Sequence, residues 1–364
     1  MRLLLALLLA LSFAAPAKAT LKAEPSIAYD TLCLLGILSG DPFYVKFYPA
    51  ERERWWNALP PEAQQAATRI VARFKRDNGI TSASLTLWYS TLSPVTLDDV
   101  LAAARAPERI VDAMRPLRWW NEDSAASIRE TAPDVAVVIE ALRKAGFEQY
   151  WTTELRPKLQ TRAQEIEAAA QGFDPSQMIE LALGKKMIKP DITVEVMFYV
   201  NPHGISLSQQ NYLASPDWPI PITISTALHE SLHPPFEKQD PKLWAVLNVL
   251  RKDKVLLPRV EHHNKSYGYN TFEGFVEEDC VKALERAMGK RLGLGTDADT
   301  EKLFRMSDDG MHVLAPVVYR LLNETNFLDG KESFQTWLIR LVKTGRIAPG
   351  KIPPIEGAAW KPVD

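Results

Sequence analysis

Residues 223–233 read TISTALHESLH, and this stretch decides which fold is expected. It contains the pattern H-E-x-x-H at His229, Glu230 and His233. Side chains four residues apart lie on one face of an α-helix, so both imidazoles can bind one Zn²⁺ ion at about 2.0–2.1 Å. Glu230 follows the first histidine and can accept a proton from a water at the metal. The stretch therefore predicts a helix with two zinc ligands and a general base.

The residues around the pattern predict that this helix is mostly buried. They are apolar or small: Ile222, Ile224, Ala227, Leu228 and Leu232. Burying polar side chains without partners is costly, and a metal ion is the simplest partner for two histidines and a glutamate. Histidines that only make hydrogen bonds, or that lie at the surface, would give the same pattern. Pro234 and Pro235 predict that the helix ends directly after His233.

A catalytic zinc site has three protein ligands and one open position, so a third ligand is expected elsewhere. A helix predicted from Phe272 to Met288 carries Glu273 and Glu277 on one face. We expect Glu273 to bind the metal, and Gly274 to let the two helices approach closely. Glu277 is expected to accept a hydrogen bond from the other ring nitrogen of His229.

The sequence leaves three further residues open as the third ligand. They are Glu277 itself and the loop residues Glu261 and His262. Glu278 and Asp279 are expected on an exposed acidic helix surface. Cys280 is expected to pack in the core because a glutamate ligand suffices.

The two helices resemble the core of the gluzincin-type zinc metallopeptidases. The residues that carry the resemblance are His229-Glu230-x-x-His233 and Glu273-Gly274-x-x-x-Glu277. The resemblance implies an edge strand beside the active-site helix, with which substrate backbone can pair. Residues 192–200 are β-branched and aromatic and are expected to form that strand, with 205–208 as its partner.

The resemblance also implies a tyrosine or histidine that donates a hydrogen bond to the oxyanion of the reaction. Tyr319 is the first candidate and His312 the second. Tyr267 and Tyr269, which precede Glu273, are further candidates.

The whole chain predicts a mostly helical α+β protein, with a gluzincin-like catalytic core, a small edge sheet and a large N-terminal helical lobe. We divide it into a signal peptide at 1–19, a helical N-terminal lobe at 20–185, a zincin-like core at 186–295 and a C-terminal helical part of the catalytic lobe at 296–364. Helical patterns run over residues 30–38, 61–75, 96–104, 123–144, 148–171, 241–253, 308–322 and 332–342, and 261–264 is expected to be a polar loop. A further hypothesis is that the N-terminal helices roof the cleft.

The first residues indicate export. Arg2 is followed by an apolar run from Leu3 to Ala15 and by a small-x-small pattern that predicts cleavage after Ala19. This run is shorter than the roughly 20 residues that span a bilayer, and no later run reaches that length. We therefore expect a periplasmic or secreted protein without a membrane span after cleavage.

Charge and cysteine content limit the expected partners. The net charge of −2 at pH 7 gives no basic surface for nucleic acid. Cys33 and Cys280 are the two cysteines, and the sequence leaves open whether they pair or stay free. The oligomeric state is also left open.

The expected function is zinc-dependent hydrolysis of peptide bonds in a peptide or protein substrate, with Glu230 as general base. A second hypothesis is a helical binding protein that zinc stabilises and that hydrolyses nothing. A third is a zinc amidase that acts on a cell-wall amide.

Overall fold

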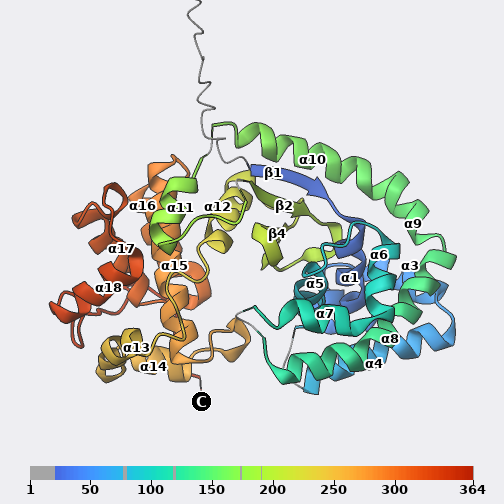
Figure 1. The fold of residues 1–364 in the computed structure, drawn as a ribbon, viewed down its shortest axis with the longest axis horizontal. Coiled ribbons are helices and arrows are strands. Elements are labelled where there is room, and N and C mark those ends of the chain that lie inside the picture. The colour runs from blue at the N-terminus through green and yellow to red at the C-terminus, as the bar shows by residue number, and fades with distance from the viewer. Residues whose placement is uncertain (1–20, 77–79, 118–119, 173, 190, 364) are drawn as a thin grey trace, which may run out of the picture.

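The computed structural model describes residues 21–76, 80–117, 120–172, 174–189 and 191–363. It is mostly helical with one four-stranded mixed sheet, which confirms the α+β class. The predicted signal peptide at 1–19 lies outside the described residues. Figure 1 shows two helical halves, with α1 (Ile27–Leu38) and α3–α8 (within residues 49–144) in one, α13–α18 (within residues 241–343) in the other, and α12 (Ile220–Ser231) near the junction.

The helices and strands follow one another in this order. Those before the H-E-x-x-H stretch are β1 (Leu21–Pro25), α1 (Ile27–Leu38), α2 (Pro42–Val45), α3 (Pro49–Ala58), α4 (Pro61–Arg76), α5 (Thr81–Ser90), α6 (Leu97–Arg105), α7 (Pro107–Met114), α8 (Glu122–Lys144), α9 (Phe147–Tyr150), a π-helical segment (Trp151–Leu155), α10 (Arg156–Ala169), α11 (Ser176–Leu183), β2 (Ile192–Val196), β3 (Ile205–Ser206) and β4 (Asn211–Ala214). The others are α12 (Ile220–Ser231), α13 (Pro241–Leu247), α14 (Leu256–His262), α15 (Phe272–Arg291), α16 (Asp297–Met306), α17 (Leu314–Glu324) and α18 (Phe334–Lys343).

The sheet has the strand order β1-β2-β4-β3. β2 is parallel to β1 and β4, while β3 is antiparallel to β4. All five residues of β2 are buried, as expected for an interior parallel strand. The expectation of an edge strand at 192–200 is therefore wrong. The strand ends at Val196, and β1 and β3 are the two end strands of the described sheet.

Two strands of the sheet were not expected from the sequence because both are short. β1 begins two residues after the end of the predicted signal peptide, and β4 lies just before a stretch with three prolines, at 216, 219 and 221. Residues 205–206 do form a strand, but they pair with β4 and not with 192–196. Short strands carry too few alternating positions to stand out from a loop.

The H-E-x-x-H helix α12 ends earlier than expected. Its last residue is Ser231 and its C-terminal cap is Leu232, so His233 lies just beyond the helix. The residue before a proline is disfavoured in helical conformation, and Pro234 follows His233. The two histidine rings nevertheless stay together, with their centroids 5.0 Å apart.

Helix α15 is buried almost around its whole circumference. Thr271 caps its first turn by accepting a hydrogen bond from the Gly274 N–H. Its apolar residues belong to the core, and Glu277, Glu278, Asp279 and Glu285 are buried with them. α15 packs against both α12 and α17. The expectation that Glu278 and Asp279 face solvent is therefore wrong.

Three further elements differ from expectation. The expected polar loop at 261–264 begins inside α14, and His263 is buried. α16 was not expected. α17 starts at Leu314, six residues later than the predicted helix, because Asp308 and Asp309 adopt left-handed backbone conformations that a helix does not accommodate.

Segments that are far apart in the chain pair or pack with one another. β1 from the N-terminal segment pairs with β2, and α11 packs on α18. Cys33 and Cys280 are both buried free thiols. Among the described residues, no helix has the length and apolar character needed to cross a membrane.

Candidate metal centre

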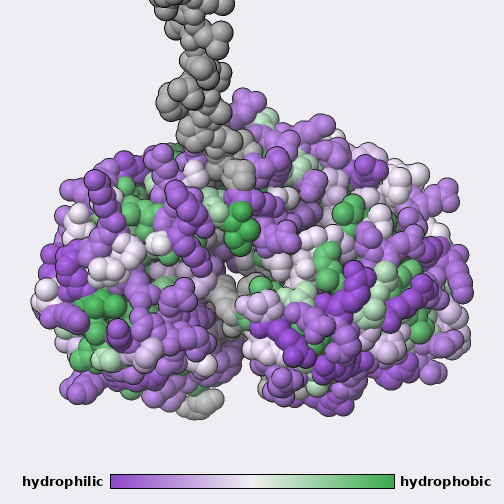
Figure 2. All heavy atoms as spheres, in the orientation of Figure 1, coloured by the Kyte–Doolittle hydropathy of each residue, from purple (hydrophilic) through white to green (hydrophobic). Residues whose placement is uncertain are grey.

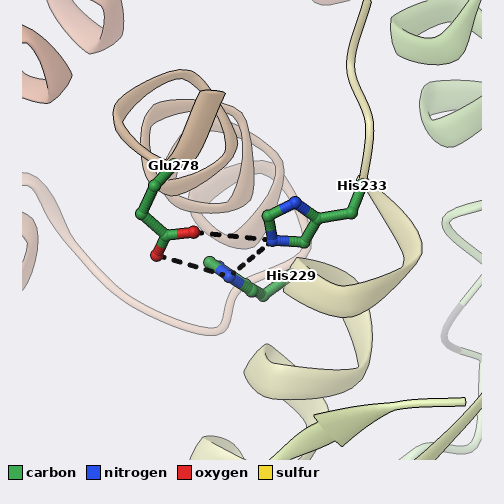
Figure 3. Close-up of side chains that lie close together, drawn as sticks. All are labelled: His229, His233 and Glu278. Atoms are coloured by element: carbon green, nitrogen blue, oxygen red, sulfur yellow. Dashed lines mark hydrogen bonds and ion pairs between the residues drawn. The ribbon is translucent and has the colours of Figure 1, made fainter. Parts of the chain in front are cut away.

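His229, His233 and Glu278 bring three ligand atoms together (Figure 3). The two Nε2 atoms lie 3.2 Å apart. Glu278 reaches between them from α15, with its oxygens 3.6 Å from His229 Nε2 and 3.5 Å from His233 Nε2. Ligand atoms about 2.0–2.2 Å from a tetrahedral zinc are separated by about 3.3–3.6 Å. The separation of the two imidazole nitrogens is therefore close to that of two ligands of one tetrahedral metal ion, and one ligand atom from each of the three residues lies within 4.8 Å of the other two.

Each histidine is oriented by a second carboxylate at its other ring nitrogen. His233 Nδ1 lies 3.0 Å from Glu277 Oε1, and His229 Nδ1 lies 3.3 Å from Glu285 Oε2. Such carboxylate partners fix the ring orientation of metal-binding histidines and turn the Nε2 atom toward the ion. Glu277 was expected to orient a histidine and does so, but its partner is His233 and not His229.

The outer carboxylates are themselves held by cations and hydroxyls. Glu285 accepts hydrogen bonds from Ser225 and Arg286. Glu277 pairs with Lys238. Lys282, whose side chain is mostly buried, lies 3.4 Å from Glu278 and from Asp308. The site thus sits in a connected network in which the charges have partners.

The structure does not bring Glu273 to the histidine pair, which corrects the expected third ligand. Glu273 lies in the first turn of α15, is 41% exposed and pairs with Arg251 at 2.6 Å. Glu278, and not Glu273, is the carboxylate that lies with the two histidines. Glu261 and His262, which the sequence also allowed as ligands, are exposed side chains that pair with each other.

The pattern on α15 explains the difference. Glu278 and Glu285 are seven residues apart, so they lie on one face of the helix two turns apart. His229 contacts both of them. Acidic residues within an otherwise apolar helical pattern are the sequence signal for this face, because buried charges need partners, but the sequence analysis assigned Glu278 to the solvent side. The expected ligand Glu273 lies nearer the start of the same helix, where it pairs with Arg251.

Electrostatics favour a cation at this position. Burial opposes the charged imidazole of His229, but Glu278, Glu285 and Glu230 outweigh burial and raise its pKa to about 10. Burial also opposes the charged form of Glu285, yet His229, Arg286 and Ser225 lower its pKa to about 2. For Glu278, His229 and Lys282 likewise overcome burial and hold the pKa well below its usual range. The carboxylates are therefore ionised, as metal binding requires.

Glu230 is close to the site without being one of the three ligand residues. It lines a cavity together with Ser231, His233 and Pro234. Its charge contributes to the raised pKa of His229, after burial, Glu278 and Glu285, which shows that it is near that imidazole. The position suits a carboxylate that accepts a proton beside the metal and then passes it on.

Tyr269 is the phenol that the structure brings to this group. Burial raises the pKa of its phenol well above the usual range, and the nearby charges of Glu278 and Glu230 raise that pKa further. The phenol therefore keeps its proton and can donate it in a hydrogen bond. Tyr269 also lines a second cavity beside His233.

The backbone at Tyr269 is strained. Its φ of 58° follows a Gly268 φ of 83°, and a non-glycine residue with positive φ is uncommon. The buried His263 holds this turn, since its Nε2 lies 2.9 Å from the Gly268 carbonyl oxygen. Strain of this kind concentrates at functional sites.

The two leading candidates for the oxyanion donor lie elsewhere. The Tyr319 hydroxyl donates to Asp297 at 2.6 Å and its ring packs on Phe304. Both ring nitrogens of the buried His312 are engaged, one by Asp279 at 2.5 Å and the other by Asp308 at 3.0 Å. His312 thus supports the network behind Glu278, and aspartates already engage the hydrogen-bonding atoms of both Tyr319 and His312.

Two imidazoles and one carboxylate form a donor set that catalytic zinc sites use. The residues present therefore fit a zinc ion bound by His229, His233 and Glu278. The chain matches no protein-family model, no curated protein and no solved structure. Function is accordingly argued from the site itself.

Proposed function

We propose that the protein is a zinc-dependent metallopeptidase that hydrolyses peptide bonds. The observation that carries the proposal is the triangle of His229, His233 and Glu278, with a second carboxylate on each imidazole and Glu230 beside it. A site that only stabilised the fold would be closed by four protein ligands. Among the described residues, three converge here, and two cavities adjoin the site.

In this proposal Glu230 transfers the proton, and Tyr269 stabilises the negative charge that develops on the substrate. Zinc, when bound, supplies Lewis-acid chemistry and lowers the pKa of its water to about 7. Glu230 accepts the proton of the attacking water and delivers it to the leaving nitrogen. Tyr269 donates a hydrogen bond to the oxygen that gains negative charge on the substrate carbonyl. His229 and His233 would bind zinc through Nε2 after loss of the proton there, while Glu285 and Glu277 accept from their Nδ1–H groups.

The end strand β3 supports a peptide as the substrate. Ser206 and the residues after it line the same cavity as Glu230. An extended peptide can add its backbone to the end strand of a sheet and so present successive side chains to opposite sides. A peptide bound in this way would pass the cavity that Glu230 lines.

Tyr269→Phe removes the proposed oxyanion donor and keeps the ring. We expect kcat to fall about 10²–10³-fold, as for the loss of one oxyanion-hole donor, while KM and bound zinc stay nearly unchanged. Steady-state kinetics with a quenched fluorescent peptide would measure this. The matched control is Tyr319→Phe, which removes a hydroxyl that bonds to Asp297 and should leave kcat unaltered. Equal losses in both variants would contradict the assignment of Tyr269.

Removal of the metal tests the proposed function itself. The purified protein should hydrolyse members of a mixed quenched-peptide library, lose this activity on dialysis against a chelator and regain it with one equivalent of Zn²⁺. Metal content before and after dialysis would be measured on the same samples. Stoichiometric zinc without hydrolysis of any library member would instead support a binding protein that zinc stabilises.

A further inference from the structure

The cavity that Glu230 lines lies between the two halves of the molecule. Figure 2 shows the molecular surface hollowed between these halves. The cavity has a volume of about 480 Å³, which is within the range of small-ligand sites. Leu117 comes from the N-terminal half, Ile179 and Leu183 from α11, and Glu230 and His233 from the metal centre. A side chain bound here would therefore lie next to the general base.

The cavity wall is mainly apolar. Besides Leu117, Ile179 and Leu183, it includes Met187 and Leu207. Ile188 at its rim is 78% exposed, the highest exposure among the large apolar side chains of the described chain. A concave site with an apolar wall is suited to bury the apolar surface of a ligand.

The rim carries positive charge. Lys185 and Lys186 line the cavity, whereas Glu230 is its one carboxylate among the described lining residues. Lys186 pairs with Glu180 at 2.5 Å. Lys185 is exposed and is the lysine best placed to meet a negative charge on a ligand.

Gln210 holds the rim in place. Its Oε1 accepts hydrogen bonds from the N–H groups of Ile188 at 2.5 Å and Lys189 at 3.2 Å. Its Nε2 donates to the carbonyl oxygens of Lys189 at 2.7 Å and Asp191 at 3.1 Å. Gln209 and Gln210 both have positive φ, 59° and 60°. This strained turn after β3 therefore fixes the segment that carries Lys185 to Ile188, so the cavity is preformed.

We propose that this cavity is a specificity subsite that takes a large apolar side chain of a peptide, with Lys185 favouring an acidic residue beside it. The proposal rests on the proposed function, because it assumes that the peptide lies across the metal centre. The apolar wall would bury the side chain, and the preformed rim lowers the entropy cost of binding. Selection comes from the difference between large and small side chains in a pocket of fixed shape.

Peptide binding to zinc-loaded Glu230→Gln protein tests the subsite without requiring turnover. The probes are fluorescein-labelled glycine/serine peptides with one variable residue and one neighbour, and affinity is measured by fluorescence anisotropy. Leucine or phenylalanine at the variable position should bind at least about tenfold tighter than glycine. Aspartate as the neighbour should bind about two- to fivefold tighter than lysine.

Variants of the cavity locate the effect. Leu183→Glu places a charge in the apolar wall and should abolish the preference for a large side chain. Ile188→Glu at the exposed rim should reduce the same preference, and it keeps the test valid if Leu183→Glu does not fold. Lys185→Glu should reverse the preference for aspartate over lysine. The controls are Met306→Glu, at a side chain 67% exposed, and Lys302→Glu, at an exposed residue of α16, which should change neither preference.

The outcomes separate this inference from the proposed function. Equal affinities for leucine and glycine peptides, or a preference that survives in both Leu183→Glu and Ile188→Glu, would overturn the subsite. Hydrolysis by the unmodified protein would still stand in that case. Selective binding together with no zinc-dependent hydrolysis would keep the subsite as a binding site and would overturn the proposed activity.

Discussion

Glu230→Gln is expected to keep its zinc and to lose nearly all hydrolysis. Glu230 is not one of the three residues whose ligand atoms converge, so its amide leaves the donor set intact. An amide cannot accept the proton of the attacking water, and general-base catalysis contributes about 10²–10⁴-fold in rate. We therefore expect kcat to fall by about that factor, with little change in KM.

The measurement pairs single-turnover rates with metal analysis of the same preparation. Glu301→Gln, an exposed glutamate on α16, is the matched control and should behave like the unmodified protein. Retained activity in Glu230→Gln would remove the general base from the account. Lost zinc in that variant would show instead that Glu230 helps to bind the metal.

Glu278→Ala is expected to lose the metal, whereas Glu273→Ala is expected to keep it. Glu278 supplies one corner of the ligand triangle, while Glu273 pairs with Arg251 at the start of α15. Loss of an outer carboxylate typically costs about 10–100-fold in metal affinity, and loss of a direct ligand should cost more. Turnover should disappear in Glu278→Ala and persist in Glu273→Ala.

The buried position of Glu278 calls for a second variant. Glu278→Ala would leave a cavity and would remove one of the two carboxylates beside the mostly buried Lys282, and both changes are destabilising. Glu278→Gln keeps the volume and removes only the charge. Added zinc should raise the Tm of the unmodified protein and of Glu273→Ala, because a ligand of the folded state stabilises it, but not the Tm of Glu278→Gln. A zinc-dependent Tm in Glu278→Gln equal to that of the unmodified protein would argue against this ligand.

The spacing of His229 and His233 in the sequence was sufficient to predict that these two side chains lie together. His229 and His233 are four residues apart, and that spacing brings their Nε2 atoms to 3.2 Å even though α12 ends before His233. The mostly helical α+β class was also predictable, because the long amphipathic patterns that became α4 and α8 depend on local periodicity.

The identity of the third ligand depends on how α12 packs against α15, and this packing could not be predicted from the sequence. Glu273, Glu277 and Glu278 all lie within two turns of α15, and only the contact between α12 and α15 decides which carboxylate meets the histidines. The position of the Tyr269 side chain could not be predicted from the sequence either. Tyr269 reaches Glu278 because its backbone adopts a left-handed conformation after Gly268, and side-chain direction at such a residue cannot be read from helical or strand periodicity.

The sheet was misjudged for a related reason. Residues 192–196 have the composition of a strand, but whether a strand lies at the edge or inside depends on partners from distant parts of the chain. β1 and β4 supply those partners and bury β2 on both sides. The short β3, which the sequence indicated only weakly, became the end strand beside the cavity.

Anomalous diffraction at the zinc absorption edge, from crystals of the zinc-loaded protein, tests the central claim most directly. The account predicts one strong peak about 2.0–2.2 Å from His229 Nε2, His233 Nε2 and a carboxylate oxygen of Glu278, with Glu230 and Tyr269 facing its remaining side. A peak bound by Glu273, or by none of these three residues, would contradict the account.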